Sequence, residues 1–128
     1  MTRALGCLLE RLRTDRGLSL RELGQLSDID HAYIYRMEVG DKESPSVEVL
    51  AKLARALKTG KREAEMLKYV AEHPDTDAGL VEHVLGDKTV TFGEFAAAAG
   101  AAFRGSGRPD YATLIARVRR ILNDEGHG

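Results

Sequence analysis

Apolar side chains recur at three- and four-residue spacing along almost the whole chain, and this periodicity predicts helices. The first stripe runs from Leu5 to Leu12 and ends before Gly17, a residue type that commonly terminates helices in the left-handed conformation. Ser19 and Glu22 then have the spacing of a capping box, in which each caps the backbone of the other. We therefore predict a short second helix over Leu20–Leu26.

A third helix is predicted from His31 to about Val39, because Asp30 is placed to cap its first turn and Gly40 follows its last. Ile34 and Met37 form its apolar line. The opposite face would carry aromatic and cationic groups in place of the Glu and Lys typical of a face that only meets water. Such side chains stack on, donate to and hold other molecules.

Two more helices complete the first part of the chain. Ser46 follows a proline and starts the fourth, whose predicted inward stripe is Val47, Leu50, Leu53, Ala54 and Leu57. The fifth runs from about Lys61 to Glu72 and buries Ala64, Leu67 and Val70. Pro74 cannot continue a helix, so we place the end of a first unit at residue 73.

Residues 74–128 are predicted to form a small helical region. A short helix would bury Leu80, Val81, Val84 and Leu85, and a capping box of Thr91 and Glu94 would start an alanine-rich helix carrying Phe92, Phe95 and Phe103. The only β-like run, DKTVTF, is too short to indicate a strand. The expected fold is all-α, with a five-helix domain over 1–73 and a helical dimerisation or regulatory region over 74–128.

Length and composition are those of an ordinary globular protein. The chain has 128 residues, of which 43% are hydrophobic and 30% charged, and no apolar run approaches the roughly 20 residues that cross a bilayer. Charged residues interrupt the leucines near the start, so no secretory signal is evident and we expect a cytoplasmic protein without a membrane partner. The single cysteine, Cys7, cannot form an internal disulfide and is expected in the core.

The overall charge does not by itself favour a nucleic-acid partner, because 19 basic residues face 20 acidic ones. The distribution is uneven, however. Between Ser46 and Val70 six basic residues stand against three acidic ones, and after residue 70 the acidic residues outnumber the basic ones. The basic ones are Lys52, Arg55, Lys58, Lys61, Arg62 and Lys68.

Catalytic and cofactor motifs are not evident. His73, His83 and His127 are scattered and do not have the spacing of a zinc motif, and no glycine-rich phosphate loop follows a strand. We therefore expect no enzyme activity, no metal and no cofactor.

The second and third predicted helices form a helix-turn-helix, an arrangement that places one helix in the major groove of DNA. Three short motifs accompany this arrangement: Gly-Leu-Ser before helix two, Ile-x-x-Met-Glu-x-Gly at the end of helix three, and Pro-Ser before helix four. They occur in the stretch LRTDRGLSLRELGQLSDIDHAYIYRMEVGDKESPSVEVLAKLARAL. Over about Leu5–Leu57 the chain thereby resembles the Cro and phage-repressor (Xre-type) helix-turn-helix regulators.

The resemblance implies roles for individual residues. Base edges would be met by His31, Ala32 and Arg36, of which Arg36 has a fork that can donate twice to guanine. Backbone phosphates would be held by Arg21, Tyr33, Tyr35 and Lys42, although partial burial is an equal alternative for Tyr33. An ion pair between Arg13 and Glu38 would set the tilt between helices one and three.

Some positions depart from the family pattern. Leu20 stands where a base-reading glutamine is frequent, and Asp28 where glycine is frequent in the turn. The acidic residues Asp28, Asp30, Asp41 and Glu43 lie near the expected phosphate surface and weaken it. Modest affinity per monomer favours a homodimer on a double-stranded operator.

The last predicted helix carries the dimerisation candidates, which equally could pack within the chain against the phenylalanines. They are Tyr111, Leu114, Ile115, Val118, Ile121 and Leu122. The same region could accept an inducer or a protein partner. The favoured function is a dimeric repressor that binds an inverted-repeat operator through His31–Val39. The alternative is a protein-interaction module, of antitoxin or antirepressor type, that keeps the fold with weak or no DNA reading.

Overall fold

The structure is a computed structural model that describes residues 4–40, 45–101 and 110–127. Within these ranges the regular secondary structure is entirely α-helical, with no strand, so the all-α prediction is confirmed. None of the described helices combines the length and the apolar character needed to span a bilayer. The helices are α1 (Ala4–Asp15), α2 (Leu20–Ser27), α3 (His31–Glu38), α4 (Val47–Ala56), α5 (Lys61–Glu72), α6 (Ala78–Leu85), α7 (Phe92–Ala101) and α8 (Tyr111–His127).

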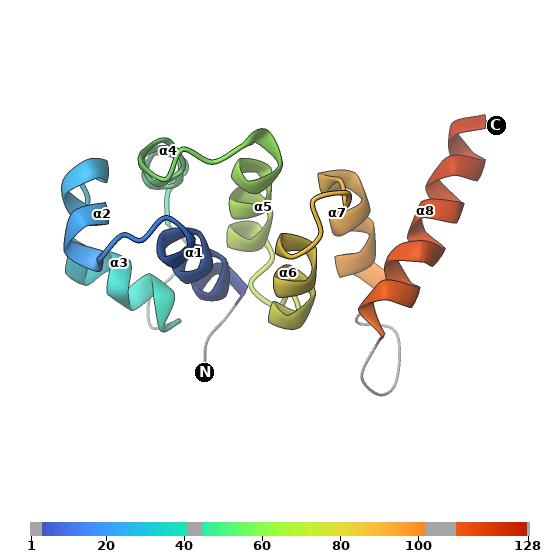
Figure 1. Ribbon diagram of the computed structural model, residues 1–128, viewed down its shortest axis with the longest axis horizontal. Coiled ribbons are helices and arrows are strands. Elements are labelled where there is room, and N and C mark those ends of the chain that lie inside the picture. The colour runs from blue at the N-terminus through green and yellow to red at the C-terminus, as the bar shows by residue number, and fades with distance from the viewer. Residues whose placement is uncertain (1–3, 41–44, 102–109, 128) are drawn as a thin grey trace.

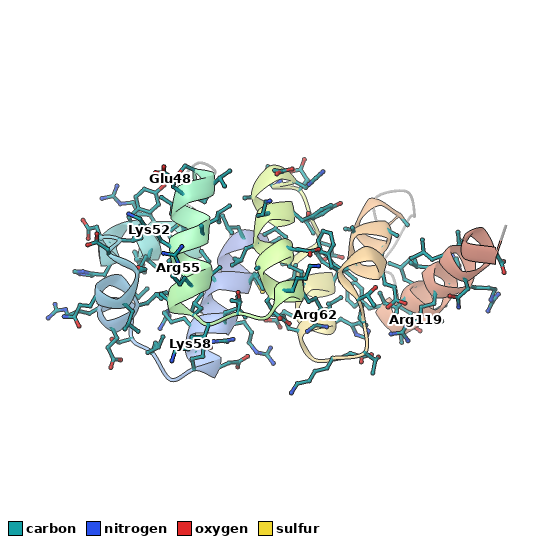
Figure 2. All side chains as sticks on the ribbon, turned by 90° about the horizontal axis from the view of Figure 1, so that it is seen from above. Glu48, Lys52, Arg55, Lys58, Arg62 and Arg119 are labelled. Atoms are coloured by element: carbon teal, nitrogen blue, oxygen red, sulfur yellow. The ribbon has the colours of Figure 1, made fainter. Side chains whose placement is uncertain are left out.

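The helices form an elongated row. Figure 1 shows α2 and α3 at one end of the long axis and α8 at the other, with α1, α5, α6 and α7 between them. The view from above shows the same order, with α4 on the near side (Figure 2). The two ends of the molecule therefore carry different helices: the helix-turn-helix at one and the C-terminal helix at the other.

The predicted helix boundaries are confirmed where capping residues specify them. Ser19 and Glu22 form the reciprocal capping box at the start of α2, and Asp30 accepts a hydrogen bond from the Ala32 backbone amide at 2.9 Å. Gly17 follows α1 with a φ of +66°, a conformation that suits glycine. Thr91 and Glu94 form the second capping box, at the start of α7.

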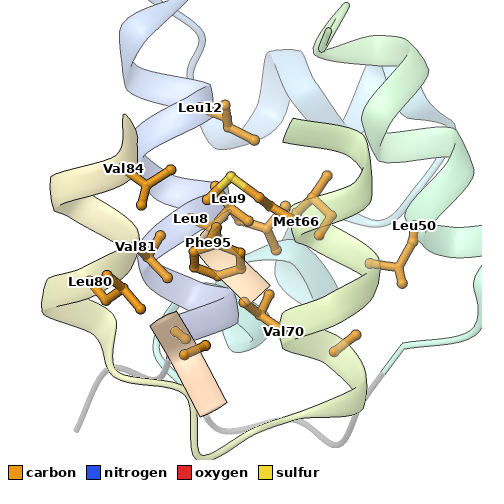
Figure 3. Close-up of a cluster of buried hydrophobic side chains, with 14 of the residues drawn as sticks. Leu8, Leu9, Leu12, Leu50, Met66, Val70, Leu80, Val81, Val84 and Phe95 are labelled. Atoms are coloured by element: carbon orange, nitrogen blue, oxygen red, sulfur yellow. The ribbon is translucent and has the colours of Figure 1, made fainter. Parts of the chain in front are cut away.

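The core runs without a break from the first part of the chain into the second. Leu8 and Leu9 of α1 and Met66 of α5 are fully buried, and side chains of α6 and α7 point into the same cluster (Figure 3). The buried side chains from α6 and α7 are Leu80, Val81, Val84 and Phe95. The predicted boundary between residues 73 and 74 thus lies within one hydrophobic cluster.

We expect a protein shortened to residues 1–73 to be strongly destabilised. Removing α6 would expose leucines of α1, and each fully buried aliphatic side chain contributes about 1.5–3 kcal/mol, so the loss should exceed roughly 5 kcal/mol. Urea unfolding followed by circular dichroism would measure it, with a protein ending at residue 109, which lacks only α8, for comparison. An unfolding free energy of 1–73 equal to that of the full chain would establish an independent domain.

Val47 and Cys7 are more exposed than expected, and the predicted core residues Ala54, Ala64 and Leu85 are only partly buried. Val47 is 69% exposed, because it lies in the first turn of α4, beyond the part of that helix that packs on α2 and α5. Cys7 is only half-buried, since it lies at the edge of the contact between α1 and α6. The rest of the α4 stripe is correct in that Leu50, Leu53 and Leu57 are buried.

The Cys7 thiol donates a hydrogen bond to Glu82 of α6, with 3.3 Å between Sγ and Oε1. Desolvation, with that hydrogen bond and the carboxylate charge, raises the pKa of Cys7 to about 12. The raised pKa depletes the thiolate, which is the reactive form, at neutral and mildly basic pH.

Alkylation of Cys7 by iodoacetamide at about pH 8 should therefore be at least roughly tenfold slower in the folded protein than in the urea-unfolded chain. Mass spectrometry of timed samples would measure both rates. The variant Glu82→Gln should react faster than the wild type when folded. Equal rates for the folded and unfolded chains would show that Cys7 is an ordinary exposed thiol.

Candidate nucleic-acid interface

The turn between α2 and α3 brings the two helices close together. Asp28 adopts the left-handed conformation, with a φ of 59°, which aspartate enters more readily than most residues do. Gly24 of α2 is buried in the contact, and a Cβ there would lie 2.9 Å from the backbone oxygen of Ile29. This close approach requires glycine, so the loss of helix propensity at position 24 is explained by packing.

Helix α3 has one buried face and one open face. Ile34 is fully buried and Met37 nearly so, and they fix the helix against α1 and α2. The open face carries Tyr35, which is 53% exposed, and Arg36, which is also exposed. Two of the predicted contact residues therefore project from a helix that is rigidly held on its other side.

Arg36 makes no hydrogen bond or ion pair with any residue that the structure describes, so its guanidinium is free to bind a ligand. His31, at the start of the helix, is half-exposed and lies 3.9 Å from the Asp30 carboxylate. Ala32 is partly buried beside it. The three predicted base-contacting residues thus occupy the first two turns of α3, with Arg36 the most open of them.

The residues predicted to contact the DNA backbone differ in their exposure. Arg21 is exposed in the first turn of α2, whereas Tyr33 is partly buried and packs against the core. Tyr33 also has an interaction within the protein, which favours the structural role that was the alternative for it. Lys42 lies outside the described residues, as do the acidic Asp41 and Glu43.

Arg13 and Glu38 join α1 to the end of α3 by a two-pronged contact. Arg13 Nε donates to Glu38 Oε2 at 2.7 Å and its Nη2 donates to Oε1 at 2.9 Å, while Nη1 donates to the Leu18 carbonyl at 2.8 Å. The Glu38 side chain is only 3% exposed. The hydrogen bonds to Glu38 raise the pKa of Arg13, against the opposing effect of desolvation.

A glycine that the sequence analysis did not single out also sets this helix contact. A Cβ on Gly6 of α1 would overlap the backbone oxygen of Glu38 and would lie 2.8 Å from that of Met37. The backbone of α1 therefore touches the end of α3 directly. In the sequence, the only indication of this close approach is that a glycine interrupts the leucine stripe of α1.

The basic residues of α4 lie on a different side of the molecule from α3. In Figure 1 α4 lies on the upper side of the molecule and α3 on the lower, with α2 between them. The view from above shows basic side chains along α4 and just past its end (Figure 2). They are Lys52, Arg55 and Lys58. Arg62 is engaged within the protein, because it pairs with Glu63 and donates to the carbonyls of Asp87 and Val90.

The C-terminal stripe divides into a buried and an exposed part. Leu114, Ile115 and Val118 are buried on α7, whereas Ile121 is 50% and Leu122 36% exposed, because α8 is longer than the helix that covers it. Tyr111 donates to Asp77 at 2.8 Å and ties the start of α8 to that of α6. Contacts within the chain thus account for four of the six predicted dimerisation residues.

Comparison with known proteins identifies the first part of the chain. A family model described as a helix-turn-helix domain matches residues 4–67, which is half of the protein and includes all of α1 to α4. The comparisons with curated proteins and with solved structures gave no match. The matched range contains the turn at Asp28, the open face of α3 and the pair of Arg13 and Glu38. The chain therefore belongs to the helix-turn-helix domain family, in agreement with its resemblance to the Xre-type regulators.

Proposed function

We propose that this protein is a sequence-specific DNA-binding transcription regulator that represses by occupying an inverted-repeat operator as a dimer. Membership of the helix-turn-helix family points to a DNA-binding regulator. Repression would follow from steric exclusion of the polymerase at a promoter that overlaps the operator.

The open face of α3 is the observation that carries this proposal. Ile34 and Met37 are buried, so His31, Tyr35 and Arg36 are presented by a rigid helix. An α-helix with its side chains is about 10–12 Å in diameter, which fits the roughly 12 Å width of the major groove. The Arg36 guanidinium has the donor geometry that reads guanine O6 and N7.

A selection from random double-stranded DNA, followed by binding titrations at two salt concentrations, tests the proposal. We expect one preferred sequence with two-fold symmetry, bound at least about a thousandfold more tightly than scrambled DNA. The same affinity for every sequence, or no binding at low salt, would refute specific recognition.

We further propose that two copies pair through the exposed end of α8, with Ile121 and Leu122 in the contact. Because α8 and α3 lie at opposite ends of the long axis, a two-fold axis at α8 would separate the two recognition helices widely. Adjacent major grooves on one DNA face are only about 34–36 Å apart, one helical turn.

We therefore expect half-sites whose centres are separated by more than one helical turn, at a multiple of the roughly 10.5 base-pair repeat. Footprinting on the selected DNA would measure the spacing. In sedimentation experiments the double variant Ile121→Ser, Leu122→Ser should be monomeric. Leu26→Ser, which changes an exposed leucine at the other end of the molecule, should leave the dimer intact. Half-sites one turn apart, together with a dimer lost only in Leu26→Ser, would place the contact near α3.

A protein-interaction module is the second candidate, favoured by the charges around α3. Asp28 and Asp30 are exposed beside it, and the free basic residues of α4 lie on another side. If the random-sequence selection returned no DNA, this function would replace the first, with the exposed end of α8 as the first surface to test for a partner.

A further inference from the structure

A cavity of about 510 Å³ lies where the end of α1, the start of α5 and the end of α6 meet. Leu12 and Asp15 line it from α1, and Leu85 lines it from α6. Its volume is within the roughly 300–1,000 Å³ range of sites for small ligands. No residue of α2 or α3 lines it, so it is separate from the candidate DNA surface.

Four basic side chains surround this cavity and come from separate parts of the chain. They are Arg16, which follows α1, Lys61 and Arg62 of α5, and Lys88 in the connection between α6 and α7. Only two carboxylates, Asp15 and Glu63, line the same space. The lining is thus net positive, although the whole protein has a formal charge of −1.

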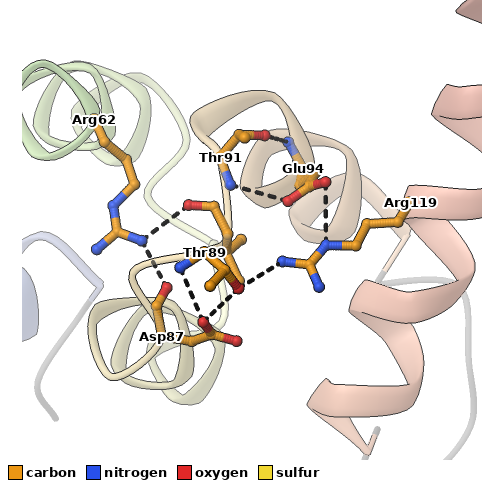
Figure 4. A network of polar contacts seen from close by, with 7 residues as sticks. Arg62, Asp87, Thr89, Thr91, Glu94 and Arg119 are labelled. Carbon is orange, nitrogen blue, oxygen red and sulfur yellow. Dashed lines mark hydrogen bonds and ion pairs between the residues drawn. The ribbon is translucent and has the colours of Figure 1, made fainter.

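Both carboxylates already have partners. Glu63 pairs with Arg62 at 2.7 Å, and Asp15 pairs with Arg11 at 3.2 Å. Arg62 is held further by the carbonyls of Asp87 and Val90, which anchor it to the connection between α6 and α7 (Figure 4). The two carboxylates of the cavity, Asp15 and Glu63, are therefore neutralised by Arg11 and Arg62. The other three basic residues of the lining are not needed to neutralise them.

Those three basic residues have no acidic partner among the residues that the structure describes. Arg16 donates to the carbonyl oxygens of Leu12 and Leu57, which orient its guanidinium without neutralising it. Lys61 and Lys88 are exposed and make no ion pair with any part of the chain that the structure describes. Three unneutralised cations that converge on one concave surface attract a multiply charged anion.

Leu12 and Leu85 add apolar surface to the charged lining. Leu12 is buried, with only 3% of its surface exposed, and Leu85 is partly exposed, so Leu85 supplies most of the accessible apolar surface. Lysine and arginine donors bind phosphate oxygens strongly, and an adjoining apolar surface suits a nucleoside or another uncharged group. A DNA duplex, in contrast, is far too large to enter a cavity of about 510 Å³.

We propose that this cavity binds a small ligand that bears a polyphosphate group, with Arg16, Lys61 and Lys88 as the phosphate-binding residues. The polyphosphate could be free or carried by a nucleoside. Binding at this position would be a function additional to DNA recognition.

Isothermal titration with sodium pyrophosphate and, separately, with ADP tests the proposal, at a constant ionic strength of about 0.15 M. We expect the wild type to bind at least one of them with a Kd of roughly 1 mM or tighter. The double variant Lys61→Ala, Lys88→Ala should bind at least about tenfold more weakly. Tighter binding of ADP would assign the leucine surface to the nucleoside, and equal binding would assign recognition to the phosphates alone.

The matched control is Lys52→Ala, Lys68→Ala, which removes the same charge from two exposed lysines that do not line the cavity. It should bind like the wild type, and melting curves without ligand should show that both double variants are folded. No binding by the wild type would overturn the proposal. An equal loss in the control variant would also overturn it, because the attraction would then be general and not that of a site.

Discussion

Arg36→Ala is expected to lower the affinity for the preferred DNA sequence by roughly tenfold to a hundredfold, since a bidentate guanine contact contributes about 1–3 kcal/mol of discrimination. Affinity for scrambled DNA should change far less, so the specificity ratio falls. The fold should be unaffected because Arg36 is exposed and unpaired among the described residues. Competition titrations with preferred and scrambled duplexes would measure both affinities.

Two further variants distinguish the loss of a positive charge from the loss of a contact with a base. Lys52→Ala removes the same charge from α4, on the side of the molecule away from α3, and should bind as the wild type does. Arg21→Ala should weaken binding to all sequences alike and reduce the salt slope by about one, as loss of a phosphate contact does. If Arg36→Ala weakened binding to every sequence equally, its role as a base reader would be wrong.

Glu38→Ala is expected to lower the free energy of unfolding by about 3–5 kcal/mol, because it leaves the Arg13 guanidinium desolvated without its partner. The two-pronged geometry and the 3% exposure of the Glu38 side chain are the reasons for so large an effect. Urea unfolding of the purified variant would measure it. Loss of this ion pair should also weaken DNA binding, because the pair fixes α3 on α1.

The neighbouring pair of Arg11 and Asp15 provides the control, because both partners are substantially exposed. Asp15→Ala should cost less than about 1 kcal/mol, the usual limit for a surface ion pair. The double variant Arg13→Met, Glu38→Leu should regain much of the stability lost in Glu38→Ala, because it buries no unpaired charge. A cost for Glu38→Ala no greater than that for Asp15→Ala would show that the pair does not hold α3.

Helix α1 connects the parts of this molecule. Gly6 and Arg13 bring it against the end of α3, and its leucines Leu8 and Leu9 pack with α5 and α6. Changes in the C-terminal helices therefore have a direct physical route to α3. This continuity of packing explains why a shortened protein is expected to lose stability and not merely a regulatory region.

Local sequence determined much of this protein. Helix caps and turns depend only on a residue and its immediate neighbours in the sequence. Examples are the caps at Ser19 and Asp30, the glycine that follows α1 at position 17, and the left-handed turn at Asp28. The pair of Arg13 and Glu38 was likewise expected, through a resemblance carried by residues in register. The helix-turn-helix family and the all-α class followed from these features.

Tertiary structure alone decided how the helices face one another. Nothing local to Lys52 or Arg55 indicates that α4 lies on the side away from α3, and nothing near Cys7 indicates that Glu82 would meet it. The cavity between Arg16, Lys61 and Lys88 likewise joins residues distant in the chain. The physical reason is that periodicity states which face of a helix is apolar, whereas contacts between helices depend on packing summed over the whole core.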